Sequence, residues 1–254
     1  MSQAFSLKGR RAVVTGGSRG IGGAVSRLLA EAGADVCIGY HSRKADADVA
    51  VGDCSAFGVQ ATAHASDLTS PAGAASLIAH SVQTLGGVDI LIHSAGIWPV
   101  EEVPVAELDD ARWARTMREN VDAMFYVARA TARVMASGGR MVFVSSTAGQ
   151  RGESMHADYG TSKGAMISFV KSLAVEVAGQ GITVNAVAPG WVDTEMCVVP
   201  FADGGKARIA KGIPVGRIAS AYDIAFPAVC LCFAGSRHVT GEIVNVNGGS
   251  VLCG

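Results

Sequence analysis

Several features that mark common classes of protein are missing from this sequence. Its 254 residues carry a formal net charge of -1, so no surplus of positive charge is available for nucleic acid or an acidic membrane surface. None of the six cysteines forms a CxxC pair, and no histidine cluster accompanies them at metal-ligand spacing, so no metal site is expected. Several cysteines lie in apolar runs, where a free thiol behaves as a small hydrophobe, which fits a reducing compartment.

Long apolar segments are also missing. The first residues, MSQAFSLKGRR, lack the apolar core of a signal peptide. The longest apolar stretch, 224–235, is about a dozen residues and is too short to span a hydrocarbon layer of ~30 Å. No linker-like change of composition and no repeat interrupts the chain. We therefore expect a soluble cytoplasmic protein with a single domain over residues 1–254.

The composition and the apolar pattern that are present predict an α/β fold. Hydrophobic residues make up 49% of the chain and charged residues 17%, which is enough for a sizeable core. Apolar strands alternate with segments of helical period, which predicts a Rossmann-type, doubly wound parallel sheet of seven strands with helices on both faces. Strands are expected at 12–15, 34–38, 60–65, 88–92, 140–144, 182–187 and 243–246, and helices at 20–32, 44–57, 70–85, 108–135, 159–177 and 221–233.

A glycine-rich turn joins the first strand to the first helix. Gly16, Gly20 and Gly22 would let the backbone approach a phosphate, which the N–H groups of a helix N-terminus attract. No lysine follows as in a P-loop. The run 16–20 also matches the G-x-S-x-G nucleophile elbow of hydrolases, with Ser18 as nucleophile, although that serine normally follows several strands rather than the first. A tight turn without any ligand is the third interpretation.

The end of the second strand bears on the choice of nucleotide. An acidic residue about 20 positions after the glycine motif would bind a ribose 2′-hydroxyl and favour NAD. None is in place here, and a 2′-phosphate would meet Arg43, His41 and, from the glycine-rich turn, Arg19. This arrangement favours NADP(H). The alternative is that His41 and Arg43 are solvated loop residues.

A second cluster of reactive side chains follows the fifth strand. Tyr159 and Lys163 are four residues apart and share one face of a helix. A nearby ammonium group lowers the pKa of a phenol, because it favours the phenolate. Ser146, at the end of the strand, would lie over the same point. These residues predict a proton-transfer site, although such Tyr–Lys pairs are also common on solvated helix surfaces.

Short motifs occur in order along nearly the whole chain. They are Thr15-Gly16-x3-Gly20-x-Gly22, Asp67, Ala95-Gly96, Asn120, Ser146, Tyr159-x3-Lys163 and Asn185-Ala186-x-Ala188-Pro189-Gly190. This pattern resembles the short-chain dehydrogenase/reductase family, and within it the 3-oxoacyl-acyl-carrier-protein reductases. Ser146 precedes Tyr159 by the 13 residues usual in that family, which selects it over Ser145.

The resemblance implies a role for each of these positions. Tyr159 would be the general acid in reduction and the base in oxidation, with Lys163 lowering its pKa and holding the nicotinamide ribose. Ser146 would bond the substrate carbonyl, and Asn120 would hold a water that relays protons. The cofactor-binding set expected from the resemblance and the charges is Gly16, Ser18, Arg19, Gly20, Ile21, Gly22, His41, Arg43, Asp67, Leu68, Ser94, Ala95, Gly96, Tyr159, Lys163, Pro189, Gly190, Val192 and Thr194.

One motif departs from the family. Its members usually show Asn-Asn-Ala-Gly after the fourth strand, and this chain has His93-Ser94-Ala95-Gly96. Ser94 is shorter than asparagine but still able to form one hydrogen bond. We expect His93 to be a core residue bonded by backbone groups rather than a ligand or a catalytic group. The cofactor contact at this motif is left open.

Large side chains lie just after several strand ends, where the pocket of an open α/β sheet forms. Trp98, His156, Trp191 and Met196 are the candidates to line it, and they indicate an apolar substrate. Trp and Met are also common as ordinary packing residues. The alternative for His156 is an exposed position in a loop. Residues 192–213, which show little periodicity, would form a mobile lid.

The predicted function is that of an NADP(H)-dependent oxidoreductase that interconverts a ketone and a secondary alcohol. The candidate activity is 3-oxoacyl-(acyl-carrier-protein) reductase of fatty acid biosynthesis, with Arg129 and Arg133 as candidate contacts for the carrier protein. The resemblance also implies a homotetramer or homodimer. The first alternative is an NAD-dependent dehydrogenase of an alcohol, sugar or steroid, which the lack of an acidic residue directly after the second strand disfavours. The second is a non-catalytic nucleotide-binding regulator, which the intact set of Asn120, Ser146, Tyr159 and Lys163 disfavours.

Overall fold

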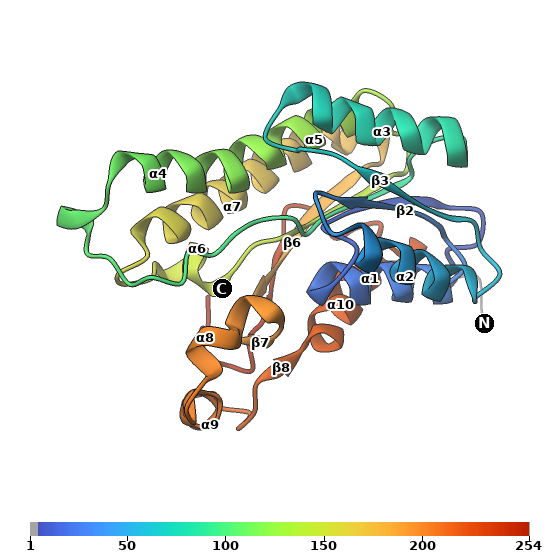
Figure 1. Ribbon diagram of the computed structural model, residues 1–254. Coiled ribbons are helices and arrows are strands. Elements are labelled where there is room, and N and C mark those ends of the chain that lie inside the picture. Colours follow the sequence, from blue (N-terminus) through green and yellow to red (C-terminus); the bar gives the residue numbers. More distant parts are fainter. Residues whose placement is uncertain (1–4, 254) are drawn as a thin grey trace.

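A single parallel sheet forms the centre of the computed structural model, which describes residues 5–253 (Figure 1). Its strand order is β3-β2-β1-β4-β5-β6-β9, so the chain first builds outward from β1 and then crosses to build outward from β4. The carboxyl ends of β1 and β4 therefore flank the switch point at which open α/β sheets bind ligands. The strands are β1 (Arg11–Thr15), β2 (Asp35–Tyr40), β3 (Ala61–Ala65), β4 (Ile90–His93), β5 (Arg140–Val144), β6 (Thr183–Pro189) and β9 (Ile243–Val246).

Helices cover both faces of the sheet, which confirms the predicted fold class (Figure 1). On one face lie α1 (Gly20–Glu31), α2 (Lys44–Ser55) and α10 (Ala221–Cys230). On the other lie α3 (Pro71–Leu85), α5 (Ala123–Ala132) and α7 (Ala157–Val177), with α4 (Asp110–Met117) extending the line of α5. Among residues 5–253 no helix is both long and apolar enough to cross a membrane.

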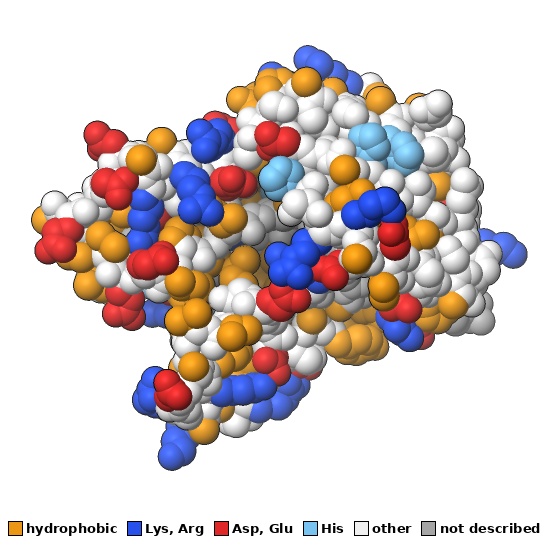
Figure 2. All heavy atoms as spheres, in the orientation of Figure 1, with side chains coloured by type: hydrophobic (Ala, Val, Ile, Leu, Met, Phe, Trp, Pro, Cys, Tyr) orange, Lys and Arg blue, Asp and Glu red, His pale blue; other side chains and the backbone are white. Residues whose placement is uncertain are grey.

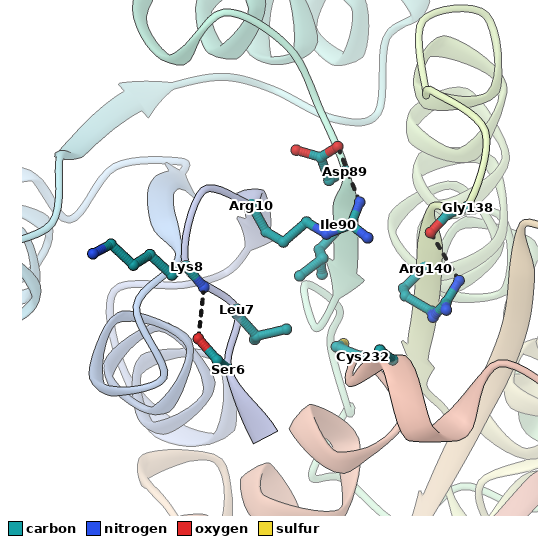
Figure 3. Close-up of a pocket in the computed structure, with 10 residues that line it drawn as sticks. Ser6, Leu7, Lys8, Arg10, Asp89, Ile90, Gly138, Arg140 and Cys232 are labelled. Atoms are coloured by element: carbon teal, nitrogen blue, oxygen red, sulfur yellow. Dashed lines mark hydrogen bonds and ion pairs between the residues drawn. The ribbon is translucent and has the colours of Figure 1, made fainter. Parts of the chain in front are cut away.

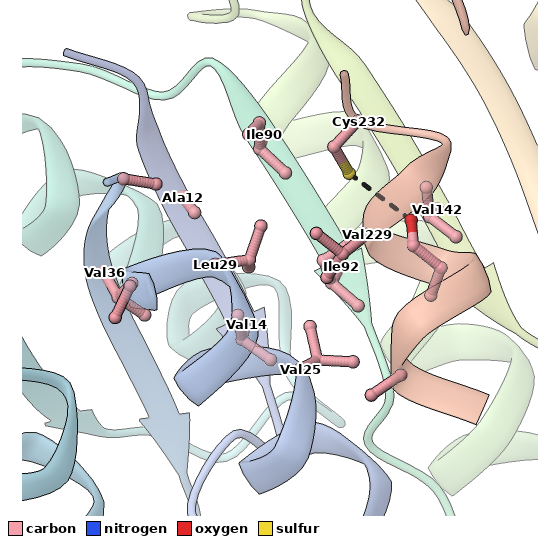
Figure 4. Close-up of a cluster of buried hydrophobic side chains, with 14 of the residues drawn as sticks. Ala12, Val14, Val25, Leu29, Val36, Ile90, Ile92, Val142, Val229 and Cys232 are labelled. Atoms are coloured by element: carbon pink, nitrogen blue, oxygen red, sulfur yellow. Dashed lines mark hydrogen bonds between the residues drawn. The ribbon is translucent and has the colours of Figure 1, made fainter. Parts of the chain in front are cut away.

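Alternate residues of the central strands enter two separate cores. Val14 and Ile92 pack with Val25 and Leu29 of α1 and with Val229 of α10 (Figure 4). Their strand neighbours point the other way, into the core beneath α3, α5 and α7. Because both faces of each central strand are buried, the strands appear in the sequence as continuous apolar runs rather than alternating ones. This is why their positions could be predicted.

The helix predicted at 108–135 contains a feature that its sequence pattern does not reveal. It runs from Asp110 to Ala132, but residues Arg118–Asp122 form a π-helical turn, η3, between α4 and α5. Such a turn inserts one residue into the helical register and often occurs at functional sites. Asn120 lies in this turn.

Two segments expected to be irregular contain short elements. Where a glycine-rich loop was expected after β5, Ser146 caps a short helix, α6 (Thr147–Arg151). The segment 192–213 contains β7 (Val192–Asp193), which pairs with β8 (Ala219–Ser220). It continues through the 3-10 turn η5 (Glu195–Cys197), α8 (Val198–Phe201) and α9 (Gly205–Lys211), which project from the body of the protein (Figure 1). The predicted mobility of this segment stays a prediction.

Candidate active site

The glycine-rich turn forms a bare backbone surface at the carboxyl end of β1. Gly16 has a φ of +62°, and a Cβ atom built there would lie 3.1 Å from the Cα of Ala95. A Cβ atom on Gly22 would lie only 2.2 Å from the carbonyl oxygen of Gly16. Helix α1 begins at Gly20, and its N-cap Arg19 provides no side-chain cap, so its first N–H groups remain available. The turn therefore fits a bound pyrophosphate, which such N–H groups attract.

Thr15 links this turn to the divergent motif after β4. Its hydroxyl oxygen accepts hydrogen bonds from the backbone N–H groups of Ser94 (3.1 Å) and Ala95 (3.2 Å). Its single proton is then free to be donated to Nδ1 of His93, 3.0 Å away. Thr15 thus holds the loop through the backbone of Ser94, whatever the side chain at that position.

His93 is a neutral core residue, as expected, but its partner is a side chain and not a backbone group. Burial, with the charge of Lys163 adding to it, lowers the pKa of His93 to about 3. Since Nδ1 accepts from Thr15, the proton of the neutral ring lies on Nε2, which has no hydrogen-bond partner among the described residues. The ring packs near Phe143, with centroids 5.9 Å apart.

Asn120 ties the π-turn to the loop after β4. Its Oδ1 accepts from the backbone N–H of Ile97 (2.8 Å), and its Nδ2 donates to Ile97 O and to Ser162 Oγ, each at 3.0 Å. A Cβ atom on Gly96 would lie 2.9 Å from Asn120 Oδ1 and 3.7 Å from the Nζ of Lys163. Only glycine fits at position 96, and Asn120 and Lys163 are brought together there.

Lys163 is buried, and its ammonium group faces the ends of the central strands. Its Nζ donates to the carbonyl oxygen of Val144, at the end of β5, over 2.8 Å. The same nitrogen lies 5.8 Å from the centroid of the Tyr159 ring. No carboxylate partner is present in its described surroundings, and burial lowers the pKa of Lys163 to about 8. The group is therefore close to its titration point at physiological pH.

Tyr159 and Ser146 meet beside this lysine. Burial raises the pKa of the Tyr159 phenol, while a hydrogen bond from Ser146 acts in the opposite direction. Lys163 is not among the groups that shift the pKa of Tyr159, so the lowering expected from it is not seen. Ser145 has a different hydrogen-bond partner, since its hydroxyl donates to the carbonyl oxygen of Lys163 (3.1 Å). The geometry thus places Ser146, and not Ser145, beside the phenol, as the spacing predicts.

The lowered pKa of Lys163 predicts a dependence of stability on pH. Between its native pKa of about 8 and its ordinary value of 10.5, the unfolded chain binds more protons than the native state. The free energy of unfolding therefore rises with pH in that window, as the cost of burying the charge disappears. Relative to Lys163→Met, the wild type should gain roughly 2 kcal/mol between about pH 7.5 and about pH 9.5, measured by urea denaturation.

Lys171→Met removes an exposed lysine from the same helix and is the matched control. Its stability should change with pH in parallel with that of the wild type. Parallel curves for Lys163→Met and the wild type would contradict the burial of a charged Lys163.

Aromatic rings cluster around His156, three residues before Tyr159 in the chain. Trp98 stacks on His156, with centroids 5.0 Å apart, and meets Trp191 edge-on at 5.8 Å. Trp191 in turn lies 5.9 Å from Phe201 of α8. Of the four residues expected to line a pocket, these rings bring three together, whereas Met196 is 44% exposed and outside the ring cluster.

Glu153 belongs to this cluster, although nothing in its sequence context singled it out. Burial raises the pKa of its carboxyl group, which accepts a hydrogen bond from the Trp98 indole. Its charge contributes to the raised pKa of Tyr159. The neighbouring Met155 has a φ of +66°, a strained backbone conformation for this residue type. A carboxyl group and a residue with a strained backbone thus lie beside the cluster of aromatic rings.

The cations expected around a 2′-phosphate separate into two groups. Arg19 and Arg43 both form ion pairs with the carboxylate of Glu195, which for Arg43 Nη2 lies at 3.2 Å. His41 lies instead near Asp67, whose pKa is lowered by hydrogen bonds from the hydroxyl and N–H of Thr69 and, more weakly, by the charges of His41 and Arg118. Figure 2 shows charged side chains of both signs gathered on one border of the hollow in this face.

The remaining expected residues surround the turn or pack beneath it. A Cβ atom on Gly20 would lie 3.6 Å from the Cγ2 of Thr194, so the segment after β7 begins directly over the turn. Ile21 and Leu68 pack against the two cores. Pro189 and Val192 are buried at the end of β6 and in β7, and Gly190 packs against Asn247. The side chain of Ser18 makes no hydrogen bond with the described residues.

A separate cavity of about 430 Å³ lies at the opposite edge of the sheet (Figure 3). It is lined by residues at the amino ends of the strands, including Arg10, Asp89 and Arg140. Asp89 is bound by Arg11, whose Nε donates to its Oδ2 over 2.6 Å. None of the expected site residues lines this cavity. No group of three or more His, Cys, Asp or Glu side chains suited to a metal occurs within 5–253.

Known proteins share this architecture over its whole length. The family model described as Enoyl-(Acyl carrier protein) reductase matches residues 16–250. A short chain dehydrogenase from Burkholderia cenocepacia, solved in complex with NADP, superposes with a TM-score of 0.90 and 32% identity, covering 96% of this chain and 98% of that one. The 3-oxoacyl-[acyl-carrier-protein] reductase FabG of Vibrio cholerae is 35% identical over 250 residues, 98% of this chain and 100% of the relative. The chain belongs to the short-chain dehydrogenase/reductase family.

As a member of this family, the chain is an oxidoreductase. The interpretation of Ser18 as a hydrolase nucleophile is therefore wrong, which agrees with its position after the first and central strand. Versicolorin reductase 1 of Aspergillus parasiticus is another relative, 36% identical over 263 residues that cover 98% of this chain and 99% of that protein. The relatives thus include a reductase named for a carrier-bound acyl group and one named for versicolorin.

Proposed function

We propose that this short-chain dehydrogenase/reductase is an NADP(H)-dependent enzyme that interconverts a ketone and a secondary alcohol. The observation that carries the proposal is the convergence of Ser146, Tyr159 and Lys163 beside the bare glycine-rich turn. The turn and Thr194 would hold the cofactor, with Arg19 and Arg43 as partners for a 2′-phosphate. When bound, the cofactor would supply the hydride that reduces the carbonyl carbon.

The chain's own residues would manage the proton. The raised pKa of Tyr159 keeps its phenol protonated at neutral pH, so the group is ready to donate a proton to the carbonyl oxygen. The Ser146 hydroxyl would donate a second hydrogen bond to that oxygen and stabilise its developing charge. The positive charge of Lys163 would favour the phenolate that remains after transfer. Asn120 would hold the loop that carries Gly96 beside Lys163, through its hydrogen bonds with the backbone of Ile97.

The first candidate substrate is a 3-oxoacyl group on acyl carrier protein, as named for the bacterial relative. Arg129 and Arg133 of the α5 region remain candidate contacts for acyl carrier protein. The guanidinium of Arg129 lies over the rings of Phe125 (4.7 Å) and Tyr126 (5.4 Å), which holds a positive charge on an exposed aromatic surface.

A second candidate is a planar aromatic ketone. The rings of Trp98, His156 and Trp191 form an aromatic cluster beside Glu153, whose charge acts on Tyr159. Glu153 would accept a hydrogen bond from a phenolic hydroxyl of such a substrate. The similarity to a versicolorin reductase supports this candidate.

Exposed apolar side chains and free cysteines bear on the assembly and location of the protein. We propose a homodimer or homotetramer that covers the exposed Trp113 of α4 and Val175 of α7, which are 41% and 81% exposed. The six cysteines are all free, which fits a cytoplasmic location.

A cofactor-coupled assay tests the proposed function. Purified protein would be mixed with NADPH or NADH and with either an acetoacetyl thioester, free or on carrier protein, or a bicyclic aromatic ketone. We expect oxidation of NADPH, with kcat/KM about tenfold higher than for NADH, because a 2′-phosphate attracts the guanidinium groups of Arg19 and Arg43 and a 2′-hydroxyl does not. The better substrate identifies the substrate class. Oxidation of neither cofactor with any ketone would refute the enzyme assignment, and a strong preference for NADH would refute the cofactor assignment.

A further inference from the structure

No acidic residue directly follows the second strand, but the fold brings Glu195 to the arginines that lie there. We propose that its carboxylate takes the position of the cofactor's 2′-phosphate between Arg19 and Arg43 and thereby sets the preference between NADPH and NADH. The inference rests on the proposed function, because it takes these arginines as the 2′-phosphate site.

Two arginines from different elements meet at a single oxygen of this residue. Arg19 precedes α1 and Arg43 precedes α2, and both guanidinium groups contact Oε2 of Glu195. Arg43 has a second, longer contact of 3.5 Å with Asp46. Glu195 is 152 residues from Arg43 in the chain, so the contact arises from the fold alone. Two convergent guanidinium groups around one anionic oxygen are the arrangement that also binds a phosphate.

The backbone around Glu195 is anchored over the glycine-rich turn. The preceding strand β7 pairs with β8, Val192 with Ala219. Thr194 packs over Gly20, and its carbonyl oxygen accepts from the N–H of Cys197 (3.0 Å), which forms the turn that carries Glu195. The backbone that carries the Glu195 carboxylate is therefore anchored on both sides of this residue.

The two cofactors would meet this carboxylate differently. A 2′-phosphate carries almost two negative charges and three acceptor oxygens, so it attracts both arginines more strongly than a carboxylate does. It must nevertheless displace Glu195, and that competition reduces the apparent affinity for NADPH. A 2′-hydroxyl does not compete for the arginines. With NADH, Glu195 can keep its ion pairs and accept a hydrogen bond from the 2′-hydroxyl, the role that an acid after the second strand has in NAD-binding proteins.

Glu195→Gln separates these effects, and Asp193→Asn is the matched control. Asp193 lies two residues away in β7, is similarly exposed and pairs with Lys206 instead of the arginines. Both substitutions remove one negative charge from the same segment. Dissociation constants would be measured by fluorescence titration with NADPH, NADH, adenosine 2′,5′-bisphosphate and AMP, which requires no turnover.

We expect Glu195→Gln to lower the dissociation constants of NADPH and adenosine 2′,5′-bisphosphate by about three- to tenfold. The gain is limited because the ion pairs that compete are half exposed and each is weak. NADH should bind equally or more weakly, and AMP should be unaffected within about twofold. Asp193→Asn should leave the ratio of the NADPH and NADH constants within about twofold of the wild type. In an Arg43→Ala background, most of the gain from Glu195→Gln should disappear.

Equal shifts in the two variants would show a general effect of charge and overturn the inference, as would an unchanged NADPH constant in Glu195→Gln. Both outcomes leave the proposed function intact if the wild type still binds and oxidises NADPH. A wild-type protein that binds neither cofactor would instead refute the proposed function, and this inference with it.

Discussion

Replacing Tyr159 by Phe is expected to reduce kcat for ketone reduction by at least about a thousandfold. The variant keeps the ring, which packs beside Lys163, and removes only the hydroxyl that would donate the proton. Because the cofactor would bind mainly through the glycine-rich turn and the arginines, its dissociation constant should stay within about threefold of the wild type. Steady-state kinetics with NADPH and fluorescence titration of NADPH measure the two quantities on one preparation.

Tyr222→Phe removes a phenolic hydroxyl from an exposed tyrosine of α10 and is the control for this substitution. It should retain wild-type turnover. If Tyr159→Phe kept more than about a tenth of the wild-type kcat, the proton donor would have to be another group, and Glu153 would be the next candidate because its charge acts on the same phenol.

Replacing Arg112 by Met is expected to destabilise the protein by about 3 to 5 kcal/mol. Arg112 of α4 pairs with Asp158 of α7, Nε to Oδ2 at 3.1 Å, and the Asp158 side chain is fully buried. Burial alone would raise the pKa of Asp158, but hydrogen bonds from Arg112 and Thr116 hold it below the ordinary value. Without the guanidinium, a buried carboxylate would lose its counter-charge next to Tyr159. Urea or thermal denaturation measures the loss.

Two further variants distinguish this ion pair from general damage to α4. Arg115→Met alters an exposed arginine of the same helix and should change the stability by no more than about 0.5 kcal/mol. The double variant Arg112→Met/Asp158→Leu should recover part of the lost stability, because it leaves no unpaired buried charge. A loss below about 1 kcal/mol in Arg112→Met would contradict the importance of the pair.

The elements that are easiest to predict from the sequence are those with several apolar residues in a regular pattern. All seven strands of the main sheet were predicted within a few residues. The central strands show continuous apolar runs because both of their faces are buried, whereas the edge strands β3 and β9 are only partly buried. The strands β7 and β8 were missed, since each has two residues and no pattern of its own. The π-turn at Asn120 was missed for a different reason. It changes which backbone groups bond without changing the apolar positions that the pattern detects.

The site was predicted unevenly for a related reason. Tyr159 and Lys163 are neighbours on one helix, so their proximity follows from helical geometry alone. Glu195 and Glu153 have no motif, and their importance depends on which segments the fold brings to them. The partner of His93 could not be predicted either, because Thr15 reaches it through the pairing of β1 with β4.

By itself, the sequence determined the α/β fold class and the placing of its motifs after successive strands. Parallel strands expose their carboxyl ends at one edge, so motifs that follow successive strands must converge there. Only the tertiary structure decided the protonation states and the contacts of those residues. Burial raises the pKa of Tyr159 and lowers that of Lys163, and Glu195 reaches two arginines from a distant segment. Desolvation and ion pairing depend on atoms from many segments at once, and no local pattern contains that information.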